Sequence, residues 1–226
     1  MSEAPDHTTA YRSLRTRVTE LASGLDDEAS LAIVPATPDW RIKDLIAHFA
    51  GTTADLVAGK LEGAGSDDWT EAQVAPRRDA SLADLLDEWN ACADEFDSMI
   101  PDIPIFQRSQ VLFDAETHEQ DLRGALGVVG ARDSDAFDIG WEWAAAIVGQ
   151  MRDGHQAGAL RLRTDAGDQV VGAGDVTATV SADRFELFRA MTGRRSVAQV
   201  KAYPWEGEPK VGHLCFLPCR PDDLVE

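Results

Sequence analysis

Apolar residues recur at helical spacing through the first two thirds of the chain. One series begins at Tyr11 and ends at Gly24. Thr37-Pro38 resembles an N-cap followed by proline at the first helical position, Ser81 opens a capping box, and Gly127 follows the last residue of a further series. A stretch rich in Gly and Asp, residues 62–68, predicts a loop. The pattern therefore predicts helices over residues 8–24, from Thr37 to about Leu56, from Ser81 to Pro101, over residues 109–126, and from Phe137 to Met151.

The last third of the chain has a different pattern. Residues 159–164 and 176–180 alternate between apolar and polar side chains, as half-buried strands do. A capping box at Asp183 then starts a helix that runs to Met191, and Ser196 starts a shorter one that runs to Tyr203. We therefore predict an α+β protein, with a four-helix bundle in residues 1–154 and a small α+β module in residues 155–226.

Two histidines and an aspartate occupy unusual places in this helical pattern. His48 lies about 60° from Leu45, at the edge of the apolar stripe of the second helix. His118 takes a position in the fourth helix where an apolar residue is expected, and Asp114 precedes it by one turn on the same face. Two imidazoles and one carboxylate are zinc ligands, and three protein ligands leave one coordination position open. The pattern predicts a divalent metal site, with zinc as the ion, held by His48, Asp114 and His118.

Two further acidic residues lie close to His118 in the sequence. Asp121 follows it by three residues, so it could form a packing contact or salt bridge, or it could orient the imidazole of a metal ligand. Glu116 points about 160° away from His118 and is not expected to bind the metal. A separate cluster, His213, Cys215 and Cys219, is a weaker alternative metal site, because Cys-x-x-x-Cys near a terminus is not a typical zinc pattern.

Composition narrows the function classes. The chain has 21 Lys and Arg against 40 Asp and Glu, a net charge of −19, which argues against nucleic acid as a partner. No apolar run approaches the roughly 20 residues that cross a bilayer, so no membrane partner is expected. The first residues lack the basic and then apolar start of a secretory signal, and the three cysteines do not form an even set, so we expect a cytoplasmic protein.

Three segments resemble the mycothiol-dependent maleylpyruvate isomerase family, whose metal-binding domain is a DinB-like four-helix bundle. They are residues 35–51 (PATPDWRIKDLIAHFAG), 118–127 (HEQDLRGALG) and 182–200 (ADRFELFRAMTGRRSVAQV). The resemblance implies that His48, Asp114 and His118 hold the metal, although the family carboxylate is a glutamate and this chain has the shorter aspartate. It also implies that Arg194 and Arg195 are catalytic-site residues that reach the carboxylates of the substrate.

These observations and the resemblance predict an enzyme with a small-molecule substrate and a low-molecular-weight thiol, mycothiol, as cosubstrate. The expected activity is that of an isomerase or S-transferase acting on an electrophilic substrate such as an unsaturated carboxylic acid, with the open metal position activating the thiol. Two alternatives remain open. One is a metal-dependent hydrolase that uses water in place of the thiol, and the other is a small-ligand carrier in which the metal is only structural.

Overall fold

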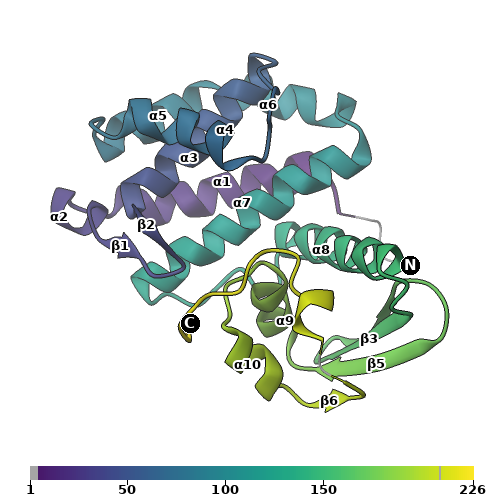
Figure 1. Ribbon diagram of the computed structural model, residues 1–226. Helices are drawn as coiled ribbons and strands as arrows, with labels where there is room; N and C mark the ends of the chain where they lie inside the picture. Colours follow the sequence, from purple (N-terminus) through teal and green to yellow (C-terminus); the bar gives the residue numbers. More distant parts are fainter. Residues whose placement is uncertain (1–4, 209) are drawn as a thin grey trace. The chain divides into compact units, whose positions relative to one another are not determined.

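The computed structural model describes residues 5–208 and 210–226 and divides into two compact units (Figure 1). The first unit extends to Ala136, and the second runs from Phe137 to Glu226. Helix α8 (Asp135–Gly154) therefore belongs mainly to the second unit, whereas the sequence-based boundary after residue 154 groups it with the bundle. None of the helices in the described residues is long and apolar enough to cross a membrane.

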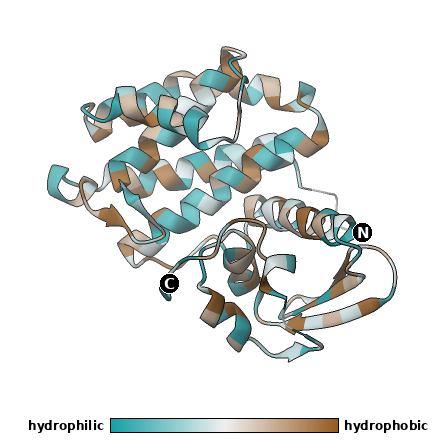
Figure 2. Ribbon diagram, viewed as in Figure 1, coloured by the Kyte–Doolittle hydropathy of each residue, from teal (hydrophilic) through white to brown (hydrophobic). Residues whose placement is uncertain are grey.

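Helices build the first unit. Helix α1 packs against α7, and α3 packs against both α5 and α7, so the site predicted on the second and fourth helices lies between neighbours. Figure 2 shows apolar and polar segments alternating along these helices, as expected for helices with one buried face. The elements of this unit are α1 (His7–Ser23), α2 (Asp27–Ser30), β1 (Ile33–Val34), β2 (Thr37–Arg41), α3 (Ile42–Val57), α4 (Asp67–Val74), η1 (Ala75–Arg77), α5 (Leu82–Ala91), α6 (Ala93–Met99), η2 (Ile100–Asp102) and α7 (Ile105–Leu126).

The start of the second predicted helix is wrong. Thr37-Pro38 does not cap a helix but begins strand β2, which pairs with β1 in a short antiparallel hairpin. Helix α3 begins at Ile42, where Arg41 and Asp44 form a capping box: the Arg41 N–H donates to Asp44 Oδ2 at 2.9 Å. A second link fixes the entry of the chain into the helix, because the Ile42 N–H donates to the carbonyl of Ala32. Pairing with an earlier segment thus overrides the local helix signal.

Two other elements differ from the pattern. The third predicted helix breaks at Cys92 into α5 and α6, which end before the short 3-10 turn that contains Pro101. Helix α4 was not predicted, and its start at Asp67 falls inside the expected loop, where Ser66 accepts a hydrogen bond from the Trp69 N–H as N-cap. The fourth predicted helix is confirmed and starts four residues earlier than expected, at Ile105, to give the 22-residue helix α7.

The second unit is the predicted α+β module with one more helix. Its sheet has the strand order β4-β3-β5-β6, in which β3 pairs antiparallel with β4 and parallel with β5. Both predicted strands are present, and the short strands β4 and β6 were missed. Its elements are α8, β3 (Ala159–Thr164), β4 (Gly167–Val171), β5 (Val176–Ser181), α9 (Arg184–Met191), α10 (Val197–Ala202), β6 (Trp205–Glu206) and η3 (Val211–His213).

Candidate metal centre

The structure brings His48, Asp114 and His118 together. His48 lies on α3, and Asp114 and His118 lie one turn apart on α7. The Nε2 atom of His48 is 3.2 Å from Asp114 Oδ2, and the Nε2 atom of His118 is 3.7 Å from Asp114 Oδ1. One ligand atom from each side chain lies within 4.8 Å of the other two, which is close enough for a single ion to bridge them. The geometric part of the prediction, that these three side chains converge, is therefore confirmed.

Hydrogen bonds fix the tautomer of His118. Its Nδ1 atom is 3.0 Å from Asp121 Oδ2, and Asp121 is completely buried. A carboxylate can only accept, so Nδ1 carries the proton and the Nε2 lone pair faces Asp114. The sequence left open whether Asp121 forms a packing contact or salt bridge or orients an imidazole. Its hydrogen bond with His118 is the contact that orientation of the imidazole requires. Burial lowers the pKa of His118, although Asp121 and Asp114 oppose that effect, and the neutral imidazole that ligates metals is thereby favoured.

A longer chain of contacts fixes the tautomer of His48. Gln73 Nε2 donates to Asp55, so its Oε1 is the atom that accepts a hydrogen bond of 3.0 Å from the Thr52 hydroxyl. Since Thr52 has given its one proton to Gln73, its oxygen can only accept from Nδ1 of His48, 3.4 Å away. The His48 Nε2 lone pair therefore also faces Asp114.

Three electron-pair donors thus converge at one point. Two imidazole lone pairs and a carboxylate repel one another unless a proton or a cation lies between them. This arrangement fits a divalent metal ion by the chemistry of its donor set. Asp114 is the accessible member, with 41% of its side chain exposed, against 4% for His48 and 10% for His118.

Two features outside the trio hold it in place. The Trp40 ring, on strand β2, lies 5.2 Å from the His48 ring and 5.4 Å from the His118 ring, measured between centroids. The unpredicted hairpin therefore serves to pack an aromatic side chain against both imidazoles. Gly51 allows helix α4 to approach α3, because a Cβ at that position would lie 2.6 Å from the Cβ of Gln73. Without that approach Gln73 could not reach Thr52.

Comparison with known proteins agrees with this geometry. Residues 11–123 match the family model described as the mycothiol maleylpyruvate isomerase N-terminal domain. The chain belongs to this family. A crystal structure of the mycothiol-dependent maleylpyruvate isomerase is similar, with a TM-score of 0.58 and 18% identity over 83% of this chain and 88% of that one. A histidine-to-alanine mutant of that isomerase matches with the same coverage and TM-score at 17% identity. No curated protein matches the chain.

In this family member a cavity opens beside the trio. It has a volume of about 680 Å³ and lies within the first unit, with Thr52 and Asp114 forming the part of its wall next to the histidines. Most of the remaining wall is apolar. The other lining residues are Leu56, Leu61, Ala64, Gly65, Trp69, Met99, Asp102, Ile103, Pro104, Gln107, Gln110 and Val111. The cavity size is typical of a small-molecule site.

Helix α7 also buries acidic residues that periodicity did not predict. Glu116 and Glu119 are fully buried, and Glu119 accepts hydrogen bonds from Arg17 and Arg123. Burial and the neighbouring Glu119 raise the pKa of Glu116 well above 4.5. Glu116 does not belong to the metal trio. Its side chain lies where α1 packs against α7, close to Arg17. The i, i+4 spacing of Glu119 and Arg123 was the available signal for this cluster.

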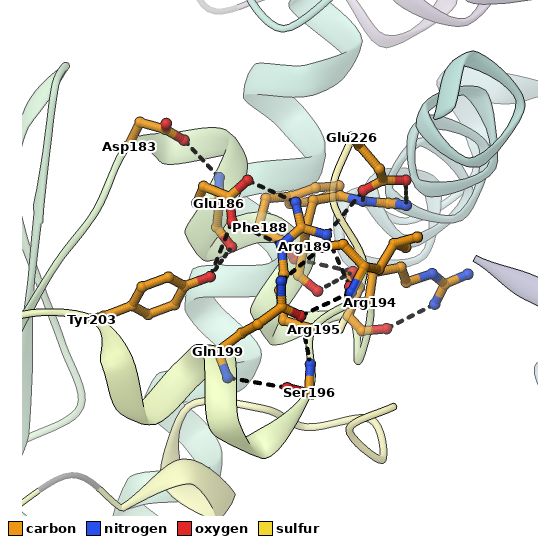
Figure 3. Close-up of polar contacts among 12 residues, drawn as sticks. Asp183, Glu186, Phe188, Arg189, Arg194, Arg195, Ser196, Gln199, Tyr203 and Glu226 are labelled. Carbon is orange, nitrogen blue, oxygen red and sulfur yellow. Dashed lines mark hydrogen bonds and ion pairs between the residues drawn. The ribbon is translucent and has the colours of Figure 1, made fainter. Parts of the chain in front are cut away.

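Arg194 and Arg195 lie in the second unit, after helix α9. Arg195 is 1% exposed and pairs with Glu186 at 2.7 Å and with Glu226 at 3.0 Å (Figure 3). Arg194 is half-buried, and its Nη1 donates to the carbonyl of Thr192. Their role as a carboxylate clamp stays a prediction. Within residues 5–208 and 210–226 the trio is the one group of three metal-ligating side chains that meet, so His213, Cys215 and Cys219 do not form the alternative site.

Proposed function

We propose that this family member is a metal-dependent, mycothiol-using isomerase or S-transferase that acts on a small electrophile, including unsaturated carboxylic acids. The convergence of three oriented electron-pair donors beside a cavity is the observation that carries this proposal. His48, Asp114 and His118 would hold the cation, which we infer to be zinc from the nitrogen and oxygen ligands. A bound cation of this kind would act as a Lewis acid and lower the pKa of a thiol.

The protein's own residues prepare this site in two ways, through the orientation of the imidazoles and through the apolar wall of the cavity. Asp121 and Thr52 keep a proton on Nδ1 of each imidazole, so that both Nε2 atoms stay available. The mostly apolar cavity wall would favour burial of the electrophile beside the cation. No protein cysteine is required as nucleophile, since Cys92, Cys215 and Cys219 are not among the residues that line the cavity.

The proposed reaction balances without an oxidant or reductant. The thiolate sulfur forms a bond to one alkene carbon, and the π electrons move toward the adjacent carbonyl. Rotation about the resulting single bond, followed by return of the electrons and departure of the thiolate, converts a cis alkene into a trans alkene. If a proton is taken up before the thiolate leaves, the product is the S-conjugate.

The experiment measures metal content and turnover together. The purified protein is expected to hold about one divalent ion per chain, and His48→Ala or His118→Ala should each remove most of it, because two remaining ligands form a weak chelate. His155→Ala, an exposed histidine in the second unit, is the matched control and should keep the ion. Turnover of unsaturated acids and esters should require both metal and mycothiol.

Each alternative gives a different result in the same assay. Turnover that needs metal but no thiol would favour the hydrolase. Tight ligand binding with no turnover under any condition would favour the carrier. Full metal occupancy in both histidine variants would contradict the site itself. Replacement of Arg194 and Arg195 should raise KM for a carboxylate substrate more than it changes metal content, if these arginines act as the predicted clamp.

A further inference from the structure

The wall of the cavity beside the trio is mostly apolar. Apolar side chains from four helices and from the loops between them face it, among them Leu56 on α3, Trp69 on α4, Met99 on α6 and Val111 on α7. Such a surface favours a ligand with a large apolar part, because burying apolar area is the main source of its binding free energy. Thr52 and Asp114 belong to the same wall, so a ligand in the cavity would lie next to the proposed metal.

The charged residues of this wall are acidic. Asp102 and Asp114 line it, and none of the lining residues is lysine or arginine. Arg108 lies nearby in the sequence but outside the lining, and its Nη1 donates to the carbonyl of Pro101. At any point away from the proposed cation, a carboxylate that enters this cavity would lose hydration without a lysine or arginine in the wall to pair with it, which is unfavourable.

The wall of the cavity also contains two neutral amide side chains. Gln107 and Gln110 line the cavity at exposed positions of α7, and within the described residues their side-chain amides form no hydrogen bond with another protein group. A primary amide donates to a carbonyl oxygen without carrying charge. The wall can therefore recognise an ester or ketone carbonyl attached to an apolar body.

Within the class of electrophiles proposed above, we propose that this site prefers an uncharged, largely apolar α,β-unsaturated ester or ketone, and that dicarboxylates are poor substrates. The proposal rests on the proposed function for the chemistry at the metal, but the ligand class rests on the cavity alone. Its carbonyl is placed by Gln107 or Gln110 and its alkene faces the Asp114 end. The thiolate adds to the alkene carbon and either leaves again, which gives the trans alkene, or stays after the adjacent carbon takes up a proton, which gives the S-conjugate.

Diethyl maleate and maleate test this directly, because they share one cis alkene and differ in charge. Binding to the metal-loaded protein without thiol is followed by tryptophan fluorescence, with Trp69 in the cavity wall as reporter. Conversion to the trans product with mycothiol is followed separately. We expect at least a tenfold lower Kd and a tenfold higher kcat/KM for the diester.

Two variants, each with a control, test whether the ligand binds in this cavity and whether the charge of the wall determines its preference. Val111→Trp fills the cavity and should weaken diester binding at least tenfold with metal content unchanged, whereas Val129→Trp, at a position that is 71% exposed and outside the lining, should not. Gln110→Lys adds a cation to the wall and should improve maleate binding about tenfold. Gln150→Lys, on an exposed position of α8, is its control.

The outcomes separate this proposal from the function it builds on. Maleate binding and turning over as well as the diester would overturn the proposed ligand class while leaving the enzyme activity intact. Unchanged diester binding in Val111→Trp would also overturn it, because the ligand would then bind elsewhere. Tight diester binding that Val111→Trp abolishes, without thiol-dependent turnover, would support the ligand class and refute the proposed reaction.

Discussion

Each imidazole of the metal trio is held by a different kind of acceptor. His118 donates to a fully buried carboxylate, Asp121, whereas His48 donates to the hydroxyl of Thr52, which is itself tied to Gln73. A charged acceptor makes a stronger hydrogen bond than a neutral one and also raises the basicity of the ligand nitrogen. The His118 side of the site should therefore be more sensitive to loss of its partner.

Removal of Asp121 tests this difference. Asp121→Ala is expected to weaken metal affinity roughly 10- to 100-fold, because the His118 ring loses the contact that sets its tautomer. Titration with a competing chelator measures the affinity. Asp97→Ala is the matched control, since Asp97 is a buried aspartate of the same unit that pairs with Arg15 and should affect stability but not affinity. Equal affinities in the two variants would contradict the orienting role.

Asp114 is tested by changing its length as well as its charge. Asp114→Ala should strongly weaken metal binding, whereas Asp114→Glu should retain it, because the carboxylate stays on the same helix face with one more methylene of reach. Asp102→Ala removes another acidic residue of the cavity wall and should leave metal binding unchanged. If Asp114→Ala binds metal normally, the third ligand lies elsewhere, and Asp121 is the next candidate.

At the scale of elements, the start of helix α3 determines how His48 is presented. Strand β2 leads directly into the capping box of Arg41 and Asp44, and His48 follows one turn later. The same strand carries Trp40, which packs against the imidazoles of both His48 and His118. The hairpin and the cap together set the direction of α3 relative to α7 within the first unit.

The contribution of this cap should depend on pH. Burial raises the pKa of Asp44, but hydrogen bonds from the Arg41 side chain and N–H outweigh it and hold the pKa below 3.8. The folded state thus binds the Asp44 proton less tightly than the unfolded state, so the stabilisation is present above pH 3.8 and is lost as the pH falls through the folded pKa.

Asp44→Asn is expected to lower the free energy of unfolding by about 1 kcal/mol at pH 7. The difference from the native chain should shrink as the pH is lowered below about 3.8. Urea denaturation at a series of pH values measures both effects. Asp133→Asn, at an exposed position of the same unit, is the control and should show neither. A difference that stays constant down to the lowest pH would contradict the electrostatic account of the cap.

At the scale of the whole molecule, the proposed ion joins two helices that already pack through apolar side chains. Leu45 on α3 and Leu112 and Leu122 on α7 are almost completely buried by apolar packing. All three residues of the trio belong to the first of the two compact units, so the ion would join helices of that unit. The site should therefore adjust the stability of the bundle without being necessary for folding, in contrast to a zinc finger.

Chelation tests this expectation. Removal of the metal should lower the melting temperature by roughly 5–10 °C, a shift that corresponds to about 2 to 3 kcal/mol of binding free energy in a chain of this size. Circular dichroism at 25 °C should show the helical signal retained. His48→Ala serves as control, because chelator should not change its melting temperature. Loss of most helix on chelation would show that the metal is needed for folding.

The sequence by itself determined the features that depend on local spacing. The apolar periodicity of α1 and α7, the capping signals of α5, α9 and α10, and the strands β3 and β5 were all predicted, since each depends on residues within a few positions of one another. His118 was found because an imidazole interrupts an apolar series, and Asp114 because it lies one turn away. The resemblance of residues 35–51 and 118–127 pointed to the same side chains and to the family that the comparison shows.

Tertiary structure decided what depends on residues far apart in the chain. The β1–β2 hairpin is too short to be stable by itself and forms because β2 leads into a capped helix. The tautomer of His48 depends on Thr52, Gln73 and Asp55, which come from two helices that meet only because residue 51 is glycine. Glu116 is buried where α1 packs against α7, and Arg17 of α1 lies 3.8 Å from its Oε2. The cavity likewise exists only where four helices and the loops between them come together, and no local sequence pattern predicts that arrangement.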